Sequence, residues 1–170
     1  MCKRVFVLLT AVVLRLGGAG DASLDRATLR GVTAVHVVMD PIAPEIEKEG
    51  ATADALRMRL EERLRSAGIQ IDPASTEFVG LRLTSVRSAR GPITQARAFA
   101  VAATIGLYQP VTLVRDRNLK TATQTWEVET VLLADTKQVY RACMDSVDEL
   151  AARFVAAYRS VNPAGEAAPH

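Results

Sequence analysis

An alternation of large and small side chains in the second half of the chain is the feature that most constrains the fold. Between residues 99 and 113 every second residue is apolar, and only Gln109 breaks the pattern. The apolar positions are Phe99, Val101, Ala103, Ile105, Leu107, Val111 and Leu113. Successive side chains of a strand point to opposite faces, so the pattern predicts one long strand with a buried face. Gly106 and Pro110 indicate a bulge or a sheet edge within it.

Two neighbouring segments share this period, and a turn at residues 116–118 joins the long strand to the later one. Their inward positions are Val79, Leu81 and Leu83 in the earlier segment and Trp126, Val128, Thr130 and Leu132 in the later one. Residues 32–39 are apolar on both faces, which is typical of an inner strand. Residues 69–71 predict a short additional strand.

Two amphipathic helices complete the pattern. The first begins near Thr52, after a predicted loop at residues 44–50, and Gly68 stands where a helix ends. Ser146 and Glu149 match a capping box, so the last helix is expected to begin at Ser146, and Asn162-Pro163 is expected to stop it. The buried stripes are Leu56, Leu60, Leu64 and Ala67 in the first helix and Val147, Leu150, Ala151, Phe154, Tyr158 and Val161 in the last.

The predicted fold class is α+β, a two-layer sandwich with element order β-α-β-β-β-β-α. Its sheet is mostly antiparallel, with both helices on one face and a polar, alanine-rich opposite face. A right-handed crossover places residues 69–71 parallel to the first strand. Residues 23–163 are expected to form one domain, followed by a disordered tail at 164–170.

The first 22 residues have the three parts of a secretory signal. Basic Lys3 and Arg4 precede an apolar stretch, and small residues follow, so cleavage is expected near Ala22. The stretch is shorter than the roughly 20 residues that a transmembrane helix needs, and Cys2 precedes it, unlike a lipoprotein cysteine. We therefore expect an exported protein, periplasmic or extracellular, without a transmembrane span. The alternative is a buried first strand or helix of a cytosolic domain, which charged Arg15 favours.

Cleavage changes the charge of the chain. The whole sequence has 21 basic and 19 acidic residues, and removal of residues 1–22 leaves 18 of each. Nucleic-acid binding needs a concentrated positive field, so a nucleic-acid partner is not expected. Cys143 is then the one remaining cysteine, and burial is favoured over pairing between chains.

Catalytic, metal-binding and cofactor motifs are not recognisable in the sequence. His36 lies in an apolar strand, and Cys143 with His36 falls short of a metal site. A small hydrolase using His36, Glu127 or Glu129 is the minor alternative, while solvated surface is favoured for the acidic residues. The protein is therefore expected not to be an enzyme.

A partner surface is the main functional hypothesis. Arg115, Arg117 and Lys120 surround one hairpin turn, where they suit anionic lipid headgroups or an acidic partner. Glu127 and Glu129 share one strand face and suit a cation or a basic partner. We expect another envelope component to bind through the sheet edge or face, with the oligomeric state open. A small solute- or lipid-binding module, with an apolar cavity between helices and sheet, is the alternative.

Several short segments resemble a loose group of small exported bacterial proteins that have no assigned activity. The similar segments lie at residues 64–69, 109–115, 123–126 and 148–163, and the resemblance covers about residues 29 to 163. The element order also looks like small envelope-accessory domains of the lipopolysaccharide-assembly or TolB N-terminal kind. The resemblance implies export and an α+β fold, and it supplies no catalytic residue.

Overall fold

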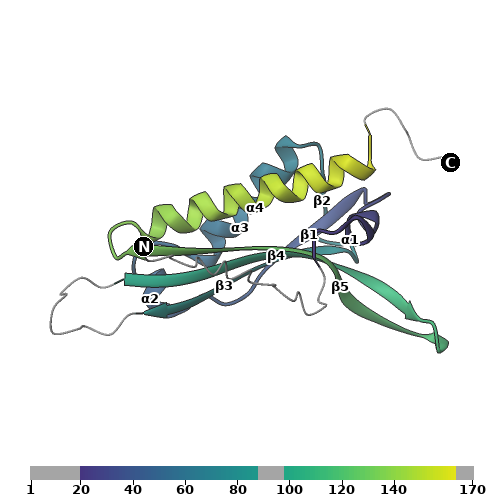
Figure 1. Ribbon diagram of the computed structural model, residues 1–170, viewed down its shortest axis with the longest axis horizontal. Coiled ribbons are helices and arrows are strands. Elements are labelled where there is room, and N and C mark those ends of the chain that lie inside the picture. Colours follow the sequence, from purple (N-terminus) through teal and green to yellow (C-terminus); the bar gives the residue numbers. More distant parts are fainter. Residues whose placement is uncertain (1–19, 88–97, 164–170) are drawn as a thin grey trace, which may run out of the picture.

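A five-stranded sheet with two long helices on one face forms the body of the protein (Figure 1). The computed structural model describes residues 20–87 and 98–163, so the predictions for residues 1–19 and 164–170 lie outside the described residues. The strands are β1 (Ala34–Met39), β2 (Gln70–Ile71), β3 (Phe78–Arg87), β4 (Ala98–Leu113) and β5 (Asp116–Asp135). Their spatial order is β2-β1-β3-β4-β5. The predicted two-layer α+β class is confirmed.

The sheet is mixed in direction. β3, β4 and β5 form an antiparallel meander, in which the pairing of β4 with β5 is the longest. β1 pairs in parallel with β2 on one side and with β3 on the other. The parallel β1–β2 pair is the one that the crossover rule predicts, because a helix connects these two strands.

Four helices are described: α1 (Ser23–Ala27), α2 (Pro44–Glu47), α3 (Ala53–Ser66) and α4 (Val139–Val161). α3 is the predicted first long helix. Thr52 caps its first turn, since its hydroxyl oxygen accepts a hydrogen bond from the Ala55 amide at 3.2 Å. Gly68 has a φ of +87°, the left-handed conformation that ends a helix and favours glycine.

The predicted start of the last helix is wrong by seven residues. α4 begins at Val139, and Ser146 lies inside it, with its hydroxyl bonded to the Ala142 carbonyl oxygen at 2.8 Å. The apolar stripe continues one turn at a time through Cys143 to Val139, so burial extends the helix beyond the capping-box signal. The turn that leads from β5 into α4 begins at Asp135, because its Oδ1 accepts hydrogen bonds from the amides of residues 137 and 138.

Two smaller predictions also need correction. The predicted loop at residues 44–50 contains the single turn α2, which starts with Pro44, a residue suited to the first helical position. The β4–β5 turn consists of Val114 and Arg115 rather than residues 116–118, because pairing with β4 extends to Asp116. Neither change alters the layers of the fold.

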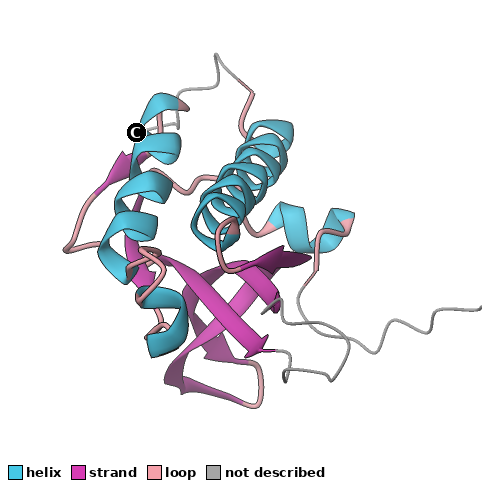
Figure 2. Ribbon diagram, turned by 90° about the vertical axis from the view of Figure 1, so that its left-hand side faces the viewer, coloured by secondary structure: helices cyan, strands magenta, loops and turns pink. Residues whose placement is uncertain are grey.

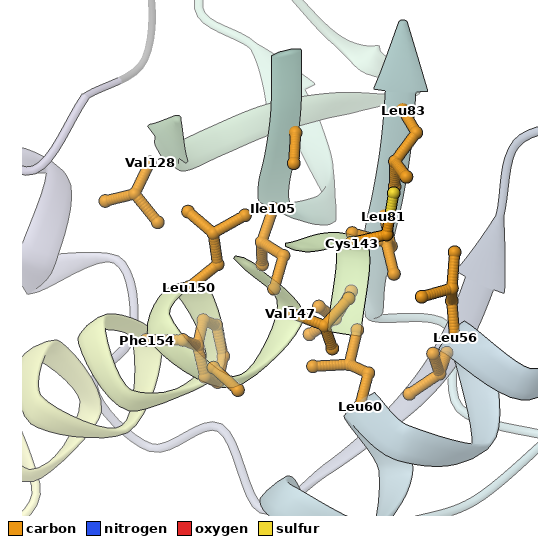
Figure 3. Packing of buried hydrophobic residues seen from close by; sticks show 14 of the residues in the cluster. Leu56, Leu60, Leu81, Leu83, Ile105, Val128, Cys143, Val147, Leu150 and Phe154 are labelled. Carbon is orange, nitrogen blue, oxygen red and sulfur yellow. The ribbon is translucent and has the colours of Figure 1, made fainter. Parts of the chain in front are cut away.

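The core lies between the sheet and the pair α3 and α4 (Figure 3). Leu56 and Leu60 of α3 and Val147, Leu150 and Phe154 of α4 point toward inward-facing residues of β3, β4 and β5. Burial of each such side chain contributes about 1.5–3 kcal/mol. Cys143 is buried here as predicted, and the loss of solvation raises the pKa of its thiol to about 11.

A short N-terminal segment is held against β5. The buried indole of Trp126 donates from Nε1 to Asp21 Oδ1 at 2.9 Å, and Arg26 pairs with the same carboxylate at 2.6 Å. The Glu127 amide donates to the Gly20 carbonyl oxygen at 3.3 Å. Gly20 and Asp21 are therefore part of the folded structure.

Candidate functional site

The face of the sheet that points away from α3 and α4 carries the candidate site. In Figures 1 and 2 both long helices lie on one side, and no described helix covers the other side. We call this side the outer face. Its central positions are Gly80, Arg82, Thr84 and Val86 of β3, Ala100, Ala102, Thr104 and Gly106 of β4, and Glu127, Glu129, Val131 and Leu133 of β5.

Two glycines paired across β3 and β4 hollow out the middle of the outer face. Gly80 lies opposite Gly106 in the register. A Cβ atom would lie 2.9 Å from the Tyr108 ring at Gly80 and 2.6 Å from Gln124 Nε2 at Gly106, so neither position has room for a side chain. The resulting hollow has a volume of about 340 Å³. We call it the glycine hollow.

Aromatic and polar side chains surround the glycine hollow. The Tyr108 ring stacks on Phe78 with parallel planes and centroids 4.7 Å apart. The Tyr108 hydroxyl donates to Gln124 Oε1 at 3.1 Å, and Gln124 Nε2 donates to Glu127. On the other side Arg82 pairs with Asp40 at 2.8 Å, and this hydrogen bond raises the pKa of the guanidinium. Arg82, Asp40 and Glu127 thus already have partners within the protein.

An apolar patch adjoins the glycine hollow along the outer face. Ala100 and Ala102 of β4 form a low floor, flanked by Val86 of β3 and by Val131 and Leu133 of β5. Val86, Val131 and Leu133 are 68%, 67% and 81% exposed. These five residues are called the apolar patch. The outer face is alanine-rich as expected, but in this region it is apolar rather than polar.

The five predicted partner-surface residues fall into two separate places. Arg115, Arg117 and Lys120 are exposed near the end of the β4–β5 hairpin. Glu127 and Glu129 lie on the outer face, opposite Gly106 and Thr104 of β4. The structure therefore does not join the basic and the acidic residues into one surface. Sequence reasoning missed the apolar patch, because Leu132 between Val131 and Leu133 makes the run look like one buried block.

The edge of β5 is partly occupied by this chain's own groups. The Gly20 carbonyl oxygen accepts from Glu127, the Thr28 hydroxyl donates to the Thr125 carbonyl oxygen at 3.4 Å, and Arg153 donates to the Glu129 carbonyl oxygen at 3.0 Å. A partner strand can pair with a sheet edge only through backbone groups that are still free. The middle of this edge is thus less open to a partner than the outer face.

The residues of the minor enzyme hypothesis are dispersed. His36 lies on β1 opposite Phe78, and Glu127 is bonded to Gln124 on β5, with β3 and β4 between the two strands. Among residues 20–87 and 98–163, no group of three or more His, Cys, Asp or Glu side chains is arranged to hold a metal ion. In the same ranges, no helix is long and apolar enough to cross a membrane.

Comparisons with known proteins give remote structural similarities. No protein-family model matches the chain, and no curated protein matches it significantly. A minor lipoprotein of Acinetobacter baumannii is 12% identical, with a TM-score of 0.41 over 82% of this chain and 99% of that one. The PelC dodecamer of Paraburkholderia phytofirmans is 12% identical, with a TM-score of 0.42 over 80% and 92%.

The rare lipoprotein B of Shewanella oneidensis is 12% identical as well, with a TM-score of 0.40 over 75% of this chain and 96% of that one. At such values the similarity is a loose correspondence in the arrangement of helices and strands. It transfers no function to this chain.

Proposed function

We propose that this protein is an exported, non-enzymatic domain that binds another component of the cell envelope through its outer face. The observation that carries the proposal is the apolar patch, whose large side chains lie mostly in solvent on a face that no described helix covers. A contiguous exposed apolar patch beside polar groups is typical of an interaction site. The export hypothesis rests on the signal-like first 22 residues.

The shape of the apolar patch favours one kind of occupant. Its alanine floor is one strand wide, and the larger residues on β3 and β5 stand two strand spacings apart, about 9–10 Å. That width suits an α-helix, whose diameter with side chains is about 10–12 Å. The proposed partner therefore contributes the apolar stripe of an amphipathic helix, as in other helix-in-groove complexes.

Site-specific photo-crosslinking in cells tests this proposal. A photo-reactive residue at position 133 should form an adduct with an envelope protein, whereas the same residue at Leu24 should not. Leu24 is a suitable control because it is also highly exposed but lies on α1. The adduct from position 133 should fall about tenfold when Val131→Glu is added, since burying an unpaired carboxylate costs more than about 1.4 kcal/mol.

Other outcomes would contradict the proposal. Equal adducts from positions 133 and 24 would indicate contact without specificity. An adduct between two copies of this chain would indicate that the outer face binds a second copy and not another envelope protein. The absence of any adduct at position 133 would rule out docking at the apolar patch. The glycine hollow would then favour the alternative, a small-solute module, because it combines an aromatic ring with hydrogen-bonding groups.

A further inference from the structure

The end of the β4–β5 hairpin extends beyond the rest of the sheet (Figure 1). β3 pairs with β4 only as far as Tyr108, so residues 109–123 form a two-stranded arm without a third strand. A register shift at Leu107 and Tyr108 marks the base of the arm, and such bulges bend and twist a strand away from its sheet. Five residues of β4 beyond Tyr108 give the arm a length of about 16 Å.

The base of the arm is held by polar side chains. Gln109 donates to Glu77 Oε1 at 3.0 Å and accepts from the Thr125 hydroxyl at 2.8 Å, which ties both strands of the arm to the start of β3. The arm therefore projects its far end in a defined direction. A two-stranded hairpin contributes little stability by itself. The stability of the fold therefore does not explain why this hairpin projects from the sheet.

The far end of the arm combines unpaired positive charge with exposed aliphatic side chains. Val114 in the turn is 97% exposed, and Leu119 is 48% exposed. Arg115, Arg117 and Lys120 are exposed, and none of them forms an ion pair within the described part of the chain. Asp116 is the single acidic residue between positions 109 and 123, so the arm has a net charge of +2.

We propose that this arm binds the surface of an anionic phospholipid bilayer. Arg115, Arg117 and Lys120 would lie among the headgroup phosphates, while Val114 and Leu119 enter the boundary with the acyl chains. The narrow, convex end favours a bilayer over an acidic protein, because a convex tip buries little area on a rigid surface but penetrates a fluid one. The proposal is independent of docking at the outer face, because the apolar patch lies at the opposite end of β4 and β5.

Vesicle co-sedimentation of the protein comprising residues 20–170 tests this binding. The probes are vesicles of phosphatidylcholine alone and vesicles with roughly one third phosphatidylglycerol, at an ionic strength of about 0.15 M and again at 1 M. We expect binding to the anionic vesicles at low salt only. The triple variant R115Q/R117Q/K120Q should bind about 100-fold more weakly, since each cation near such a surface contributes about fivefold. The variant V114S should also lose part of the binding.

A charge-matched variant provides the control. R30Q/K48Q/K137Q removes three exposed cations outside the arm and should bind like the unchanged protein. The proposal is wrong if anionic vesicles are not bound at low salt, if neutral vesicles are bound equally well, or if the control variant weakens binding as much as the arm variant. It is also wrong if the arm variant loses an acidic protein partner while vesicle binding is unchanged.

Discussion

Trp126 shows at the level of one residue how the N-terminal segment joins the core. It is the largest of the fully buried side chains, and its indole N–H needs an acceptor inside the protein. Asp21 provides that acceptor, and the hydrogen bond from Arg26 holds the pKa of the Asp21 carboxyl below its ordinary value. The carboxylate is therefore charged at neutral pH and accepts from both partners.

Replacement of Asp21 should destabilise the protein through this buried N–H. We expect Asp21→Ala to lower the free energy of unfolding by about 1–3 kcal/mol, the cost of leaving a buried donor unpaired. Asp21→Asn keeps an acceptor oxygen, so its free energy of unfolding should fall by less. Urea unfolding followed by tryptophan fluorescence measures both, since Trp126 is the only tryptophan. Equal stability of the two variants would show that the hydrogen bond contributes nothing.

At the level of elements, an ion-pair network joins α3 to α4. Asp148 of α4 accepts from Arg59 at 2.8 Å and from Arg63 at 2.6 Å, one turn apart on α3. Hydrogen bonds from Arg63 and Arg59 hold the pKa of Asp148 well below its ordinary value of 3.8. A carboxylate with a lowered pKa stabilises the fold at pH values above its ordinary pKa. This stabilisation is lost as the pH falls through the lowered pKa.

The network predicts a pH-dependent difference between the wild type and Asp148→Asn. At pH 6 the variant should be less stable by about 1 kcal/mol, a modest value because the three side chains are partly exposed. The difference should stay constant down to about pH 4 and shrink below it. Chemical denaturation at a series of pH values measures this, with Asp145→Asn as a control in the same helix, in a pair at 3.8 Å. A difference that grows toward acid would contradict the assignment.

Elements also show where local signals compete with burial. Thr52 and Gly68 bound α3 as their residue types predict, because the turns that they make involve only local hydrogen bonds. Ser146 and Glu149 carry an equally clear local signal, yet they lie inside α4. Val139 and Cys143 are fully buried, and their burial outweighs a cap contributing about 1 kcal/mol.

For the whole molecule, the proposed export depends on where the leader ends. Cleavage near Ala22 would remove Asp21 and leave the Trp126 N–H without its acceptor. We therefore expect the mature chain to begin between Leu16 and Gly20. Such a chain keeps 18 basic and 19 acidic residues, so it still has no excess of positive charge.

Cell fractionation with N-terminal sequencing checks this expectation. The mature protein should be found outside the cytoplasm and should retain Gly20 and Asp21. An intact Met1 on a cytoplasmic protein would contradict export, and a mature chain starting at Ser23 would contradict the role of Asp21. Replacing Arg15 with leucine offers a companion measurement, since a longer apolar stretch should speed cleavage if the segment is a signal.

The sequence by itself determined the class of the fold. Period-two alternation over residues 99–113 and helical spacing from Leu56 to Leu64 are properties of the chain's own geometry, so they can be read without knowledge of neighbours. The burial of Cys143 was also predicted, because a free cysteine behaves as a small apolar residue. The basic residues of the arm were also visible as a charged turn.

Only the tertiary structure decided what the outer face offers to a partner. The glycine hollow exists because Gly80 and Gly106 meet across two strands, and the apolar patch because Val86 is brought beside Leu133 over Ala100. Likewise, Asp21 meets Trp126 across 105 positions of sequence. Such pairings depend on strand register and layer packing, which no short segment of sequence encodes on its own.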